Sequence, residues 1–225
     1  MKMRKKFLAI LMAAAMTLLC VACGGNDSST DNKENDAQTS QPADTTPDTP
    51  AADSSSGTTT PAAPADFDGK LQSPFIVTSC GQSPGAVMLN MVATQAGFSS
   101  TNDNSLSAST FSAGDAKTLI ITTGTSGKGM GAAGTNVDDE IARCTDLIAA
   151  AREAGLTICC AHIEGMARRT DNSDQASIDA IMSLADVVLI IEESDSDGLF
   201  TNYTNEHNIP LLKVKDALDI GTVLE

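Results

Sequence analysis

"KTLIITTGTSGKGMGAAGTNVDDEIARCTDLIAAAREAGLTICCAHI", residues 117 to 163, is the stretch that decides the fold. Its two ends, 117–124 and 156–163, are short runs that are largely apolar, which is typical of strands buried on both faces of a sheet. The segment between them, 136–155, ends at a glycine and carries an apolar stripe at helical spacing, made of Val137, Ile141, Cys144, Ile148 and Ala151. The stretch therefore predicts a strand, a helix and a second, parallel strand.

The same alternation continues in both directions along the chain. Further strands are predicted at 74–79, 186–193 and 210–214, helices at 84–97, 173–185 and 198–207, and a terminal helix after the last strand. Right-handed crossovers turn such an alternation into an open, doubly wound α/β fold. We therefore expect one domain over residues 67–225, with a mostly parallel sheet of the flavodoxin or Rossmann type.

The N-terminus has the pattern of a bacterial lipoprotein signal. A basic start precedes an uncharged apolar run, 7–22, that is too short for a comfortable membrane span. The run ends at Val21-Ala22-Cys23-Gly24, which resembles a lipoprotein cleavage box. We expect residues 1–22 to be a signal peptide and Cys23 to carry acyl chains such as palmitate, which would anchor the protein at the extracytoplasmic face of the cell membrane. An ordinary secretory signal or an uncleaved anchor is the alternative.

Residues 23–66 are predicted to be a disordered linker between this anchor and the domain. From 24 to 66 there is no Val, Ile, Leu, Met or aromatic residue, and eight acidic residues stand against one lysine. Such a segment cannot bury enough apolar surface to offset the entropy of ordering it. The domain that follows has twenty-one acidic and nine basic residues. This balance argues against a nucleic-acid partner, which requires a basic face.

The domain contains four cysteines, Cys80, Cys144, Cys159 and Cys160, without a CxxC motif or a cluster at zinc spacing. Cys159 and Cys160 are adjacent in a predicted strand, so their side chains should point to opposite faces of the sheet. We expect all four to be buried free thiols, and we expect no metal and no cofactor.

In folds of this class, ligands bind at the carboxyl ends of the strands. Four loops should meet there: Cys80–Ser83, Gly124–Thr135, Glu164–Asp174 and Ser194–Asp197. The second contains a G-x-G-x-x-G pattern from Gly129 to Gly134, but this begins six residues after the strand ends, whereas a dinucleotide loop begins at the strand end. The glycines are better explained as one wall of a small-molecule pocket, where they would let backbone amides approach a ligand.

The first loop contains a G-x-S-x-G pattern with Ser83 in the place of a hydrolase nucleophile. The residue after it, Pro84, has no amide to donate to an oxyanion hole. We therefore expect Ser83 to cap the helix that Pro84 begins. His162 and His207 are more simply explained as structural residues than as general bases. Cys80 is then the one candidate nucleophile.

Two adjacent arginines, Arg168 and Arg169, stand out at the ligand-binding edge of an acidic domain. With Lys128 they could form an anion clamp, because a guanidinium group binds a carboxylate or phosphate through two parallel hydrogen bonds. The alternative is that both pair with Glu164, Asp171 or Asp174 and only order the loop. The next helix should be capped by Ser173 or Asp174. Asp195 and Asp197 are best explained as turn and capping acids, and the alternative is that they bind an ammonium group, hydroxyl groups or a cation.

The loops "TSCGQSPGA", "TSGKGMGAAG", "AHIEGMARRTDNSD" and "DSDGLFT" resemble the signatures of domain-of-unknown-function family 6305. The resemblance covers nearly all of 73–215 and implies an exported, often lipid-anchored α/β protein without an assigned activity. The positions that fit the family pattern are Gly81, Gln82, Ser83, Lys128, Gly129, Gly131, Gly134, Arg168, Arg169, Ser173, Asp174, Asp197 and Gly198. Glu164 and Thr170 depart from it, and an acid at 164 could neutralise one arginine.

Taken together, these patterns favour a binding module for a small polar or anionic solute, with a neighbouring transporter as a possible partner. The ligand-binding residues we expect are Gln82, Ser83, Lys128, Gly129, Gly131, Arg168, Arg169, Ser173 and Asp197. The alternative is an enzyme that acts on such a solute with Cys80 as nucleophile.

Overall fold

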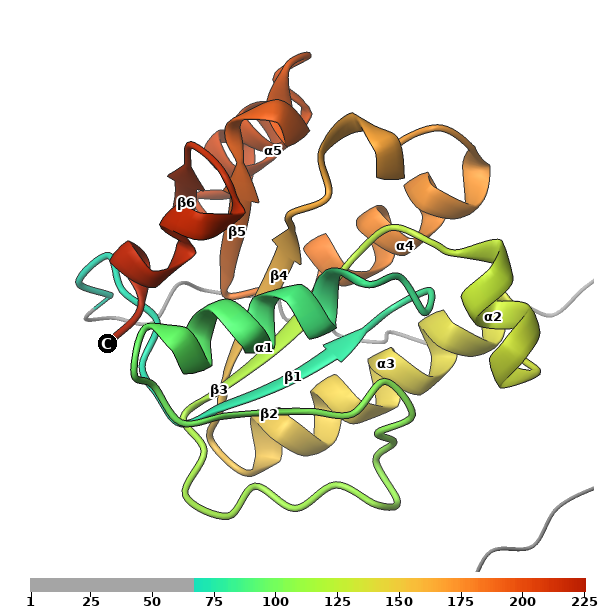
Figure 1. The fold of residues 1–225 in the computed structure, drawn as a ribbon, viewed down its shortest axis with the longest axis horizontal. Helices are drawn as coiled ribbons and strands as arrows, with labels where there is room; N and C mark the ends of the chain where they lie inside the picture. Colours follow the sequence, from blue (N-terminus) through green and yellow to red (C-terminus); the bar gives the residue numbers. More distant parts are fainter. Residues whose placement is uncertain (1–66) are drawn as a thin grey trace, which may run out of the picture. The chain divides into compact units, whose positions relative to one another are not determined.

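The computed structural model describes residues 67–225, so the predicted signal peptide, lipidated Cys23 and linker lie outside the described residues. The described part contains six strands: β1 (Phe75–Ser79), β2 (Ser100–Asn102), β3 (Thr118–Thr122), β4 (Thr157–His162), β5 (Val187–Ile191) and β6 (Leu211–Val214). They form one sheet in the order β2-β1-β3-β4-β5-β6, and every pair is parallel (Figure 1). This is the flavodoxin-like order with one added strand. The predicted α/β fold is confirmed.

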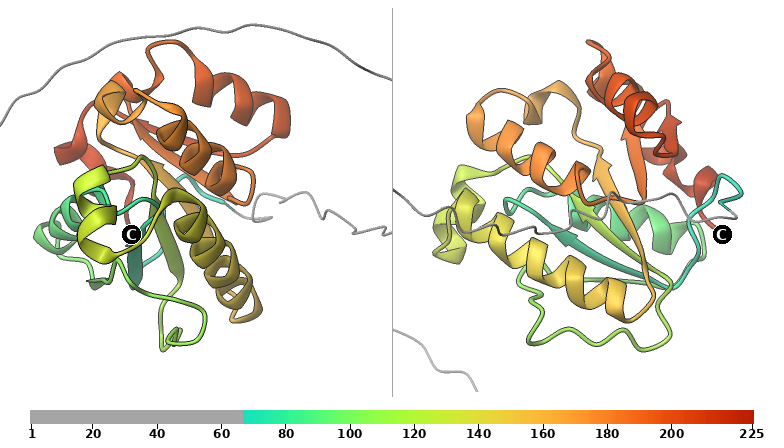
Figure 2. Two further views of the ribbon diagram at one scale, coloured as in Figure 1. Left: turned by 90° about the vertical axis from the view of Figure 1, so that its right-hand side faces the viewer. Right: turned by 180° about the vertical axis from the view of Figure 1, so that it is seen from behind.

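Helices cover both faces of the sheet (Figures 1 and 2). Helix α1 (Gly85–Gln95) and the 3-10 helix η3 (Ala217–Val223) pack on one face. Helices α3 (Val137–Glu153), α4 (Asn172–Met182) and α5 (Leu199–His207) pack on the other. Adjacent strand residues point alternately to the two layers. Cys159 lies in the α1 layer and Cys160 in the α3 layer, as predicted.

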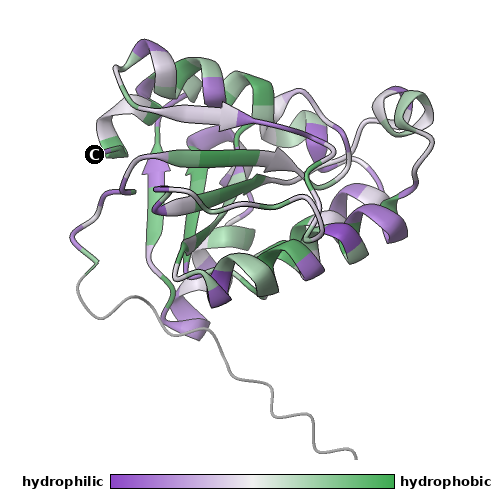
Figure 3. Cartoon of the chain, turned by 90° about the horizontal axis from the view of Figure 1, so that it is seen from below, coloured by the Kyte–Doolittle hydropathy of each residue, from purple (hydrophilic) through white to green (hydrophobic). Residues whose placement is uncertain are grey.

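The strands are buried because both of their faces are apolar. Every residue of β3 and β5 is buried, and Figure 3 shows hydrophobic strands enclosed by the helices. Each large aliphatic side chain buried in these layers contributes about 1.5–3 kcal/mol. In α4, Ile178, Ile181 and Met182 face inward and are buried. The core therefore fixes the positions of the strand ends, and the loops of the candidate site begin at these ends.

The predicted helix ends are confirmed by their glycines. Gly97 and Gly155 have φ values of 93° and 81°, which is the left-handed region that ends a helix. The stripe of α3 differs in part from the prediction. Cys144, Ile148 and Ala151 are buried, but so are Leu147 and the acidic Glu140, while Val137 is only partly buried. A buried acid near the start of α3 is the first sign of a polar cluster.

The Gly124–Thr135 loop, predicted to be irregular, contains the short helix α2 (Gly127–Ala133). Its caps explain the difference: Ser126 Oγ accepts from the amide of Gly129 (3.1 Å), and Gly134 ends the helix at φ 69°. The caps offset a cost of about 1 kcal/mol for each interior glycine.

Two other elements differ from the prediction. Strand β2 was not predicted, since its sequence, Ser-Thr-Asn, lacks apolar residues, and the predicted terminal helix is the 3-10 helix η3. Two further 3-10 helices, η1 (Gly165–Arg168) and η2 (Glu192–Asp195), follow β4 and β5. Within residues 67–225, no helix is long and apolar enough to cross a membrane.

Candidate functional site

The loops after β1 and β3 meet where the strand order reverses, which is the position where folds of this class bind ligands. An isolated bridge joins Gln82 to Thr125, and the amide of Ser126 donates to the carbonyl of Gly81 (2.8 Å). Position 81 requires glycine, since a Cβ there would lie 2.8 Å from the carbonyl oxygen of Gly124. The two loops thus form one continuous layer over the strand ends.

Gln82 is held in an uncommon backbone conformation. Its φ is 57°, a left-handed value that costs a non-glycine residue about 1–3 kcal/mol. Its Nε2 donates to both carboxylate oxygens of Glu140 (3.0 and 3.1 Å) and to the carbonyl of Asn104 (2.8 Å). The side chain predicted to contact a ligand is therefore bonded to a carboxylate of the chain itself.

Glu140 is the centre of a buried polar cluster beneath this layer. It is 2% exposed and accepts hydrogen bonds from the Gly81 amide (3.2 Å) and from Arg143 Nη2 (2.7 Å). Arg143 also donates to the carbonyl of Leu106 (2.7 Å). Burial alone would raise the pKa of Glu140, but the bonds from Arg143, Gln82 and Gly81 outweigh it and hold that pKa below its usual value.

A second buried carboxylate, Asp174, joins the loop after β3 to the loop after β4. Its Oδ1 accepts from the amide and the hydroxyl of Thr125 (2.7 and 2.8 Å). Its Oδ2 accepts from the amide and the hydroxyl of Thr170 (2.9 and 3.2 Å). Burial would raise the pKa of Asp174, but these four bonds hold it below its usual value. Asp174 therefore fixes the path of both loops.

Arg168 and Glu164 form an ion pair that reaches the start of α1. Arg168 Nε donates to Glu164 Oε2 (3.0 Å), and Arg168 Nη1 donates to the carbonyl of Thr125 (2.7 Å). The other oxygen of Glu164 accepts from the amide of Gly85 in the first turn of α1 (2.9 Å). A carboxylate of the chain thus occupies the position that an anion would take between a helix N-terminus and a guanidinium group.

Arg169 extends in the other direction, towards the loop after β5. Its Nη1 and Nη2 each donate to one oxygen of Asp197 (both 2.7 Å), and the guanidinium carbon lies 5.7 Å from the centre of the Phe200 ring. The arginine side chain is 7% exposed, whereas that of Asp197 is 51% exposed. Hydrogen bonds from Arg169 lower the pKa of Asp197 to about 2. Both arginines therefore pair with acids, and a solvent-facing carboxylate occupies the fork of Arg169.

Two buried side-chain polar atoms in residues 67–225 lack a hydrogen-bond partner: Ser83 Oγ and Arg169 Nε. Both belong to loops at the carboxyl edge. Ser83 is 1% exposed and does not cap α1, which corrects the prediction, because the N-cap residue is Pro84 and has no side-chain bond. A buried polar group without a partner costs about 1–3 kcal/mol, so each such group requires an explanation.

Three other residues of the carboxyl-edge loops, Ser173, Asp174 and Gly129, have surroundings that differ from those predicted. The cap of α4 is Asp171, whose Oδ1 accepts from the amides of Ser173 (2.8 Å) and Asp174 (3.0 Å), so neither residue is the cap. Gly129 lies against the loop after β1, because a Cβ there would be 2.2 Å from the carbonyl oxygen of Gln82. Its amide is taken by the cap of α2 and is not free for a ligand.

Lys128 and Gly131 lie on the exposed part of α2, and a Cβ at Gly131 would meet nothing within 4 Å. Asp195 is buried and accepts from the amides of Phe200 (2.9 Å) and Thr201 (3.2 Å) at the start of α5. This is the capping role predicted for it.

The four described cysteines are buried free thiols, as predicted. A hydrogen bond with Cys144 lowers the pKa of Cys80 against the opposing effect of burial, but the Cys80 side chain is 0% exposed. His162 is also buried, with Nδ1 3.0 Å from Thr123 Oγ1 and Nε2 3.2 Å from the carbonyl of Gly165. Both ring nitrogens therefore have partners within the fold.

Within residues 67–225, no group of three or more His, Cys, Asp or Glu side chains could hold a metal ion.

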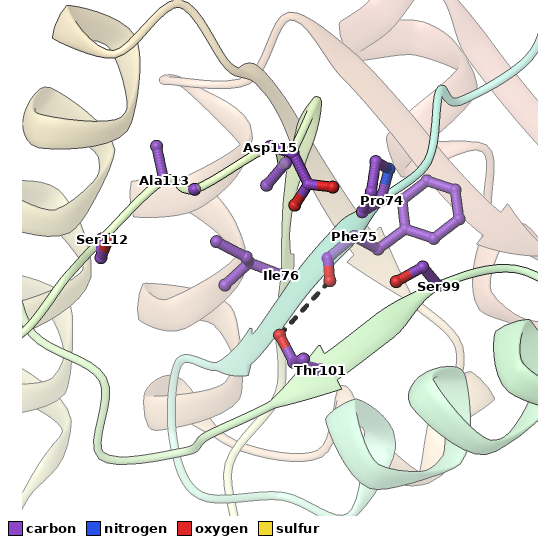
Figure 4. A pocket seen from close by; sticks show the side chains of 10 residues that line it. Pro74, Phe75, Ile76, Ser99, Thr101, Ser112, Ala113 and Asp115 are labelled. Carbon is purple, nitrogen blue, oxygen red and sulfur yellow. Dashed lines mark hydrogen bonds between the residues drawn. The ribbon is translucent and has the colours of Figure 1, made fainter.

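A cavity of about 220 Å³ lies at the opposite edge of the sheet, where β1, β2 and β3 begin (Figure 4). Phe75 and Ile76 form its apolar side, and Ser99, Thr101 and Asp115 line its rim. Its volume is below the 300–1,000 Å³ of common ligand pockets. It also contains none of the predicted ligand-binding residues, so the carboxyl edge remains the better candidate site.

Sequence reasoning missed Glu140 and Arg143, the centre of the buried cluster. One signal was available: Glu140 stands four residues before Cys144, on the apolar stripe of α3. Arg143, one turn further on, is placed to pair with it.

The chain belongs to the family whose model is described as Domain of unknown function (DUF6305), which matches residues 72–225. The match spans the whole sheet and all four carboxyl-edge loops, and it confirms the resemblance seen in the loop sequences. No curated protein and no solved structure matches the chain.

Proposed function

We propose that the domain is a binding module for a small polar or anionic solute, held at the extracytoplasmic face of the membrane by lipid on Cys23. The observation that carries the proposal is the pair of unpartnered buried atoms, Ser83 Oγ and Arg169 Nε, both in the loops at the ligand-binding edge. A solute with acceptor oxygens that reached either atom would supply the hydrogen-bond partner that the fold does not. Within this class, solutes with a carboxylate fit best, because carboxylates of the chain itself already pair with both guanidinium groups.

Asp197 would compete with such a solute for Arg169. Its side chain is 51% exposed, so water can solvate the Asp197 carboxylate when a solute carboxylate takes its place on Arg169. Glu164 is a less accessible competitor, since its side chain is 10% exposed. The proposal therefore places the exchangeable position at Arg169 and gives Arg168 the role of holding the loops together.

A thermal-shift screen of organic acids, phosphates, amino acids and metal ions against the mature chain tests this proposal. A solute at a hundredfold excess over its dissociation constant should stabilise the fold by about 2.7 kcal/mol. Asp197→Asn should strengthen the binding of a carboxylate, since it removes the competitor. Ser83→Ala should abolish the shift without lowering ligand-free stability, because Ser83 Oγ has no partner to lose.

Ser99→Ala, at the opposite edge, is the matched control and should keep the full shift. If no solute protects the parent, or if Ser83→Ala and Ser99→Ala bind equally well, the proposed site is wrong. Membrane attachment is tested separately: Cys23→Ala should release the protein from the membrane fraction, and retention of the mature variant would contradict the lipid anchor.

The alternative, an enzyme that uses Cys80, has one observation in its favour, the lowered pKa of that thiol. Its complete burial argues against direct attack on a solute. Alkylation separates the two proposals: a binding module should label at Cys80 no faster than the fold opens, whereas rapid selective labelling near pH 7 would favour the enzyme.

A further inference from the structure

Two of the buried thiols, Cys80 and Cys144, lie side by side beneath the candidate site. Cys80 follows the last residue of β1, and Cys144 lies two turns into α3. The Cys144 thiol donates to the carbonyl of Ser79, 65 positions away in the sequence (Sγ–O 3.8 Å), and it also hydrogen-bonds the Cys80 thiol. Both side chains are 0% exposed and belong to the α3 layer of the core.

The topology of the sheet keeps the other two thiols away from this pair. Cys159 lies in the α1 layer, on the far side of the sheet from the other three. Cys160 lies in the α3 layer but on β4, and β3 separates that strand from β1. Strands two places apart are about 9.5 Å from each other, whereas a disulfide joins Cα atoms about 4.4–6.8 Å apart. Cys80 and Cys144 are therefore the thiols that the fold places together.

We infer that Cys80 and Cys144 form an intramolecular disulfide when the chain folds in the presence of a small-molecule disulfide. The inference rests on the extracytoplasmic location proposed above, because disulfides form and persist outside the cytoplasm. The bond brings the two sulfur atoms to about 2.0 Å from each other, a short movement for thiols already in hydrogen-bond contact. It joins the loop after β1, which carries Gln82 and Ser83, covalently to α3.

The reaction is a thiol–disulfide exchange in two steps. Cys80 loses its proton, and the thiolate attacks one sulfur of the small disulfide, whose other sulfur leaves as a thiolate and takes up a proton. Cys144, deprotonated in turn, attacks Cys80 Sγ in this mixed disulfide and expels the second small thiolate, which is also protonated. Two protein thiols are thereby oxidised, and one small disulfide is reduced to two thiols.

The surroundings of the two thiols make Cys80 the group that attacks first. The hydrogen bond from Cys144 holds the pKa of Cys80 below that of an ordinary thiol, against the effect of burial. The same bond, and then burial, raise the pKa of Cys144. The thiolate is the nucleophile in this exchange, so the thiol with the lower pKa reacts first.

The burial of both thiols determines when the bond forms. Neither side chain reaches an oxidant in solution while the fold is closed, so the exchange takes place as the chain folds or opens. Once the core has closed, the same burial keeps reductants away from the bond. The disulfide is therefore made during folding, and it then holds the loop after β1 against α3.

Refolding in a redox buffer tests the pairing. The purified full chain is unfolded in urea with a reductant, refolded with reduced and oxidised glutathione, alkylated in urea with N-ethylmaleimide and digested. Mass spectrometry should find Cys80 linked to Cys144 at least tenfold more often than any other pair of domain cysteines. If Cys80 and Cys144 are alkylated as completely as Cys159 and Cys160, or are linked to them as often as to each other, the inference is wrong. The result does not depend on solute binding or on the membrane anchor, so it is separate from the tests of the proposed function.

The stability of each chain with and without reductant is an independent readout. A disulfide that closes a loop of about 65 residues restricts the unfolded chain, so reduction should lower the urea midpoint of the parent by about 1–2 M. Cys144→Ala cannot form the bond, so its midpoint should not respond to reductant. Cys160→Ala removes another buried thiol of the same layer and is the matched control, which should respond as the parent does. Comparing each chain with itself cancels the cost of the cavity that either substitution leaves. A parent that does not respond, or a Cys144→Ala chain that responds as fully as the parent, would overturn the inference.

Discussion

The two ends of α3 each hold a carboxylate–arginine pair, and the two pairs differ in their surroundings. At the carboxyl edge, Glu140 and Arg143 have side chains only 3% and 14% exposed. At the opposite edge, Asp186 and Arg152 are 9% and 37% exposed. Glu140 also accepts bonds from two other segments, through the Gly81 amide and Gln82. Asp186 accepts one further bond, from the amide of Ile158.

This difference indicates which edge is built to hold a defined geometry. Buried carboxylates with several donors are costly unless every bond is made, so they fix the positions of the groups around them. At the carboxyl edge, Glu140 and Asp174 hold the loops after β1, β3 and β4 in this way. A fixed set of loops that still contains two unpartnered buried atoms supports the binding site proposed above.

The largest expected effect is that of Glu140→Ala. It leaves Arg143 buried without its carboxylate and removes the acceptor of the Gly81 amide, and breaking a buried pair in this way costs about 3–5 kcal/mol. Urea unfolding followed by circular dichroism measures the loss. Glu140→Gln, which keeps the volume and one acceptor oxygen, should lose less. A loss below about 1 kcal/mol for Glu140→Ala would mean that the cluster does not hold the edge.

Asp174→Asn should destabilise the fold by about 2–3 kcal/mol at pH 7, since it weakens four hydrogen bonds to a charged acceptor. The folded pKa of Asp174 is lowered, so its contribution is complete above the unfolded pKa of about 3.9 and is lost as the pH falls through the folded value. The stability gap between parent and variant should therefore be constant above about pH 5 and shrink below pH 4. A gap that widens on acidification would have the wrong sign.

Asp186→Asn tests the amino edge and should cost less, about 1–2 kcal/mol. Arg152 is partly exposed and can turn to water when its partner loses its charge, so the main loss is a weaker bond to the Ile158 amide. The same urea titration applies. If Asp186→Asn proves as damaging as Glu140→Ala, the proposed difference between the two edges is not real.

Lys128→Ala should have the smallest effect on stability, within about 0.5 kcal/mol, because the side chain is exposed. A solute carboxylate should bind somewhat more weakly to this variant, and the difference should fade in 0.5 M salt, since exposed charges are screened. Lys117→Ala, at the opposite edge, is the matched control and should bind as the parent does. Equal binding by both variants would remove Lys128 from the site.

The strands and long helices were predictable because their patterns are local: "LIITT" and "VVLII" are apolar at most positions, and Gly97 and Gly155 mark helix ends. Strand β2 was not, because an edge strand of three polar residues is held by its pairing with β1 and not by its own composition. The order of the strands depends on the direction of each crossover, which no single segment encodes.

For the candidate site, sequence reasoning placed the right loops at one edge but could not choose the partners of their side chains. Arg168 pairs with Glu164, one of the acids proposed for it, whereas Arg169 pairs with Asp197, nearly thirty positions away. Ser83 was expected to cap a helix, but the turn after Gly81 buries its hydroxyl without a partner. Such details depend on how loops from different strands pack together.

The most direct test of the central claim, solute binding at the carboxyl edge, is an amide NMR titration of the mature chain with the best solute from the thermal screen. The amides of Gln82, Gly85 and Arg169 should shift in proportion to occupancy, together with others in the loops after β1, β3, β4 and β5. Amides at the amino edge, such as those of Ser99 and Asp115, should stay in place. Shifts confined to the amino edge, or no shifts at saturating solute, would contradict the account.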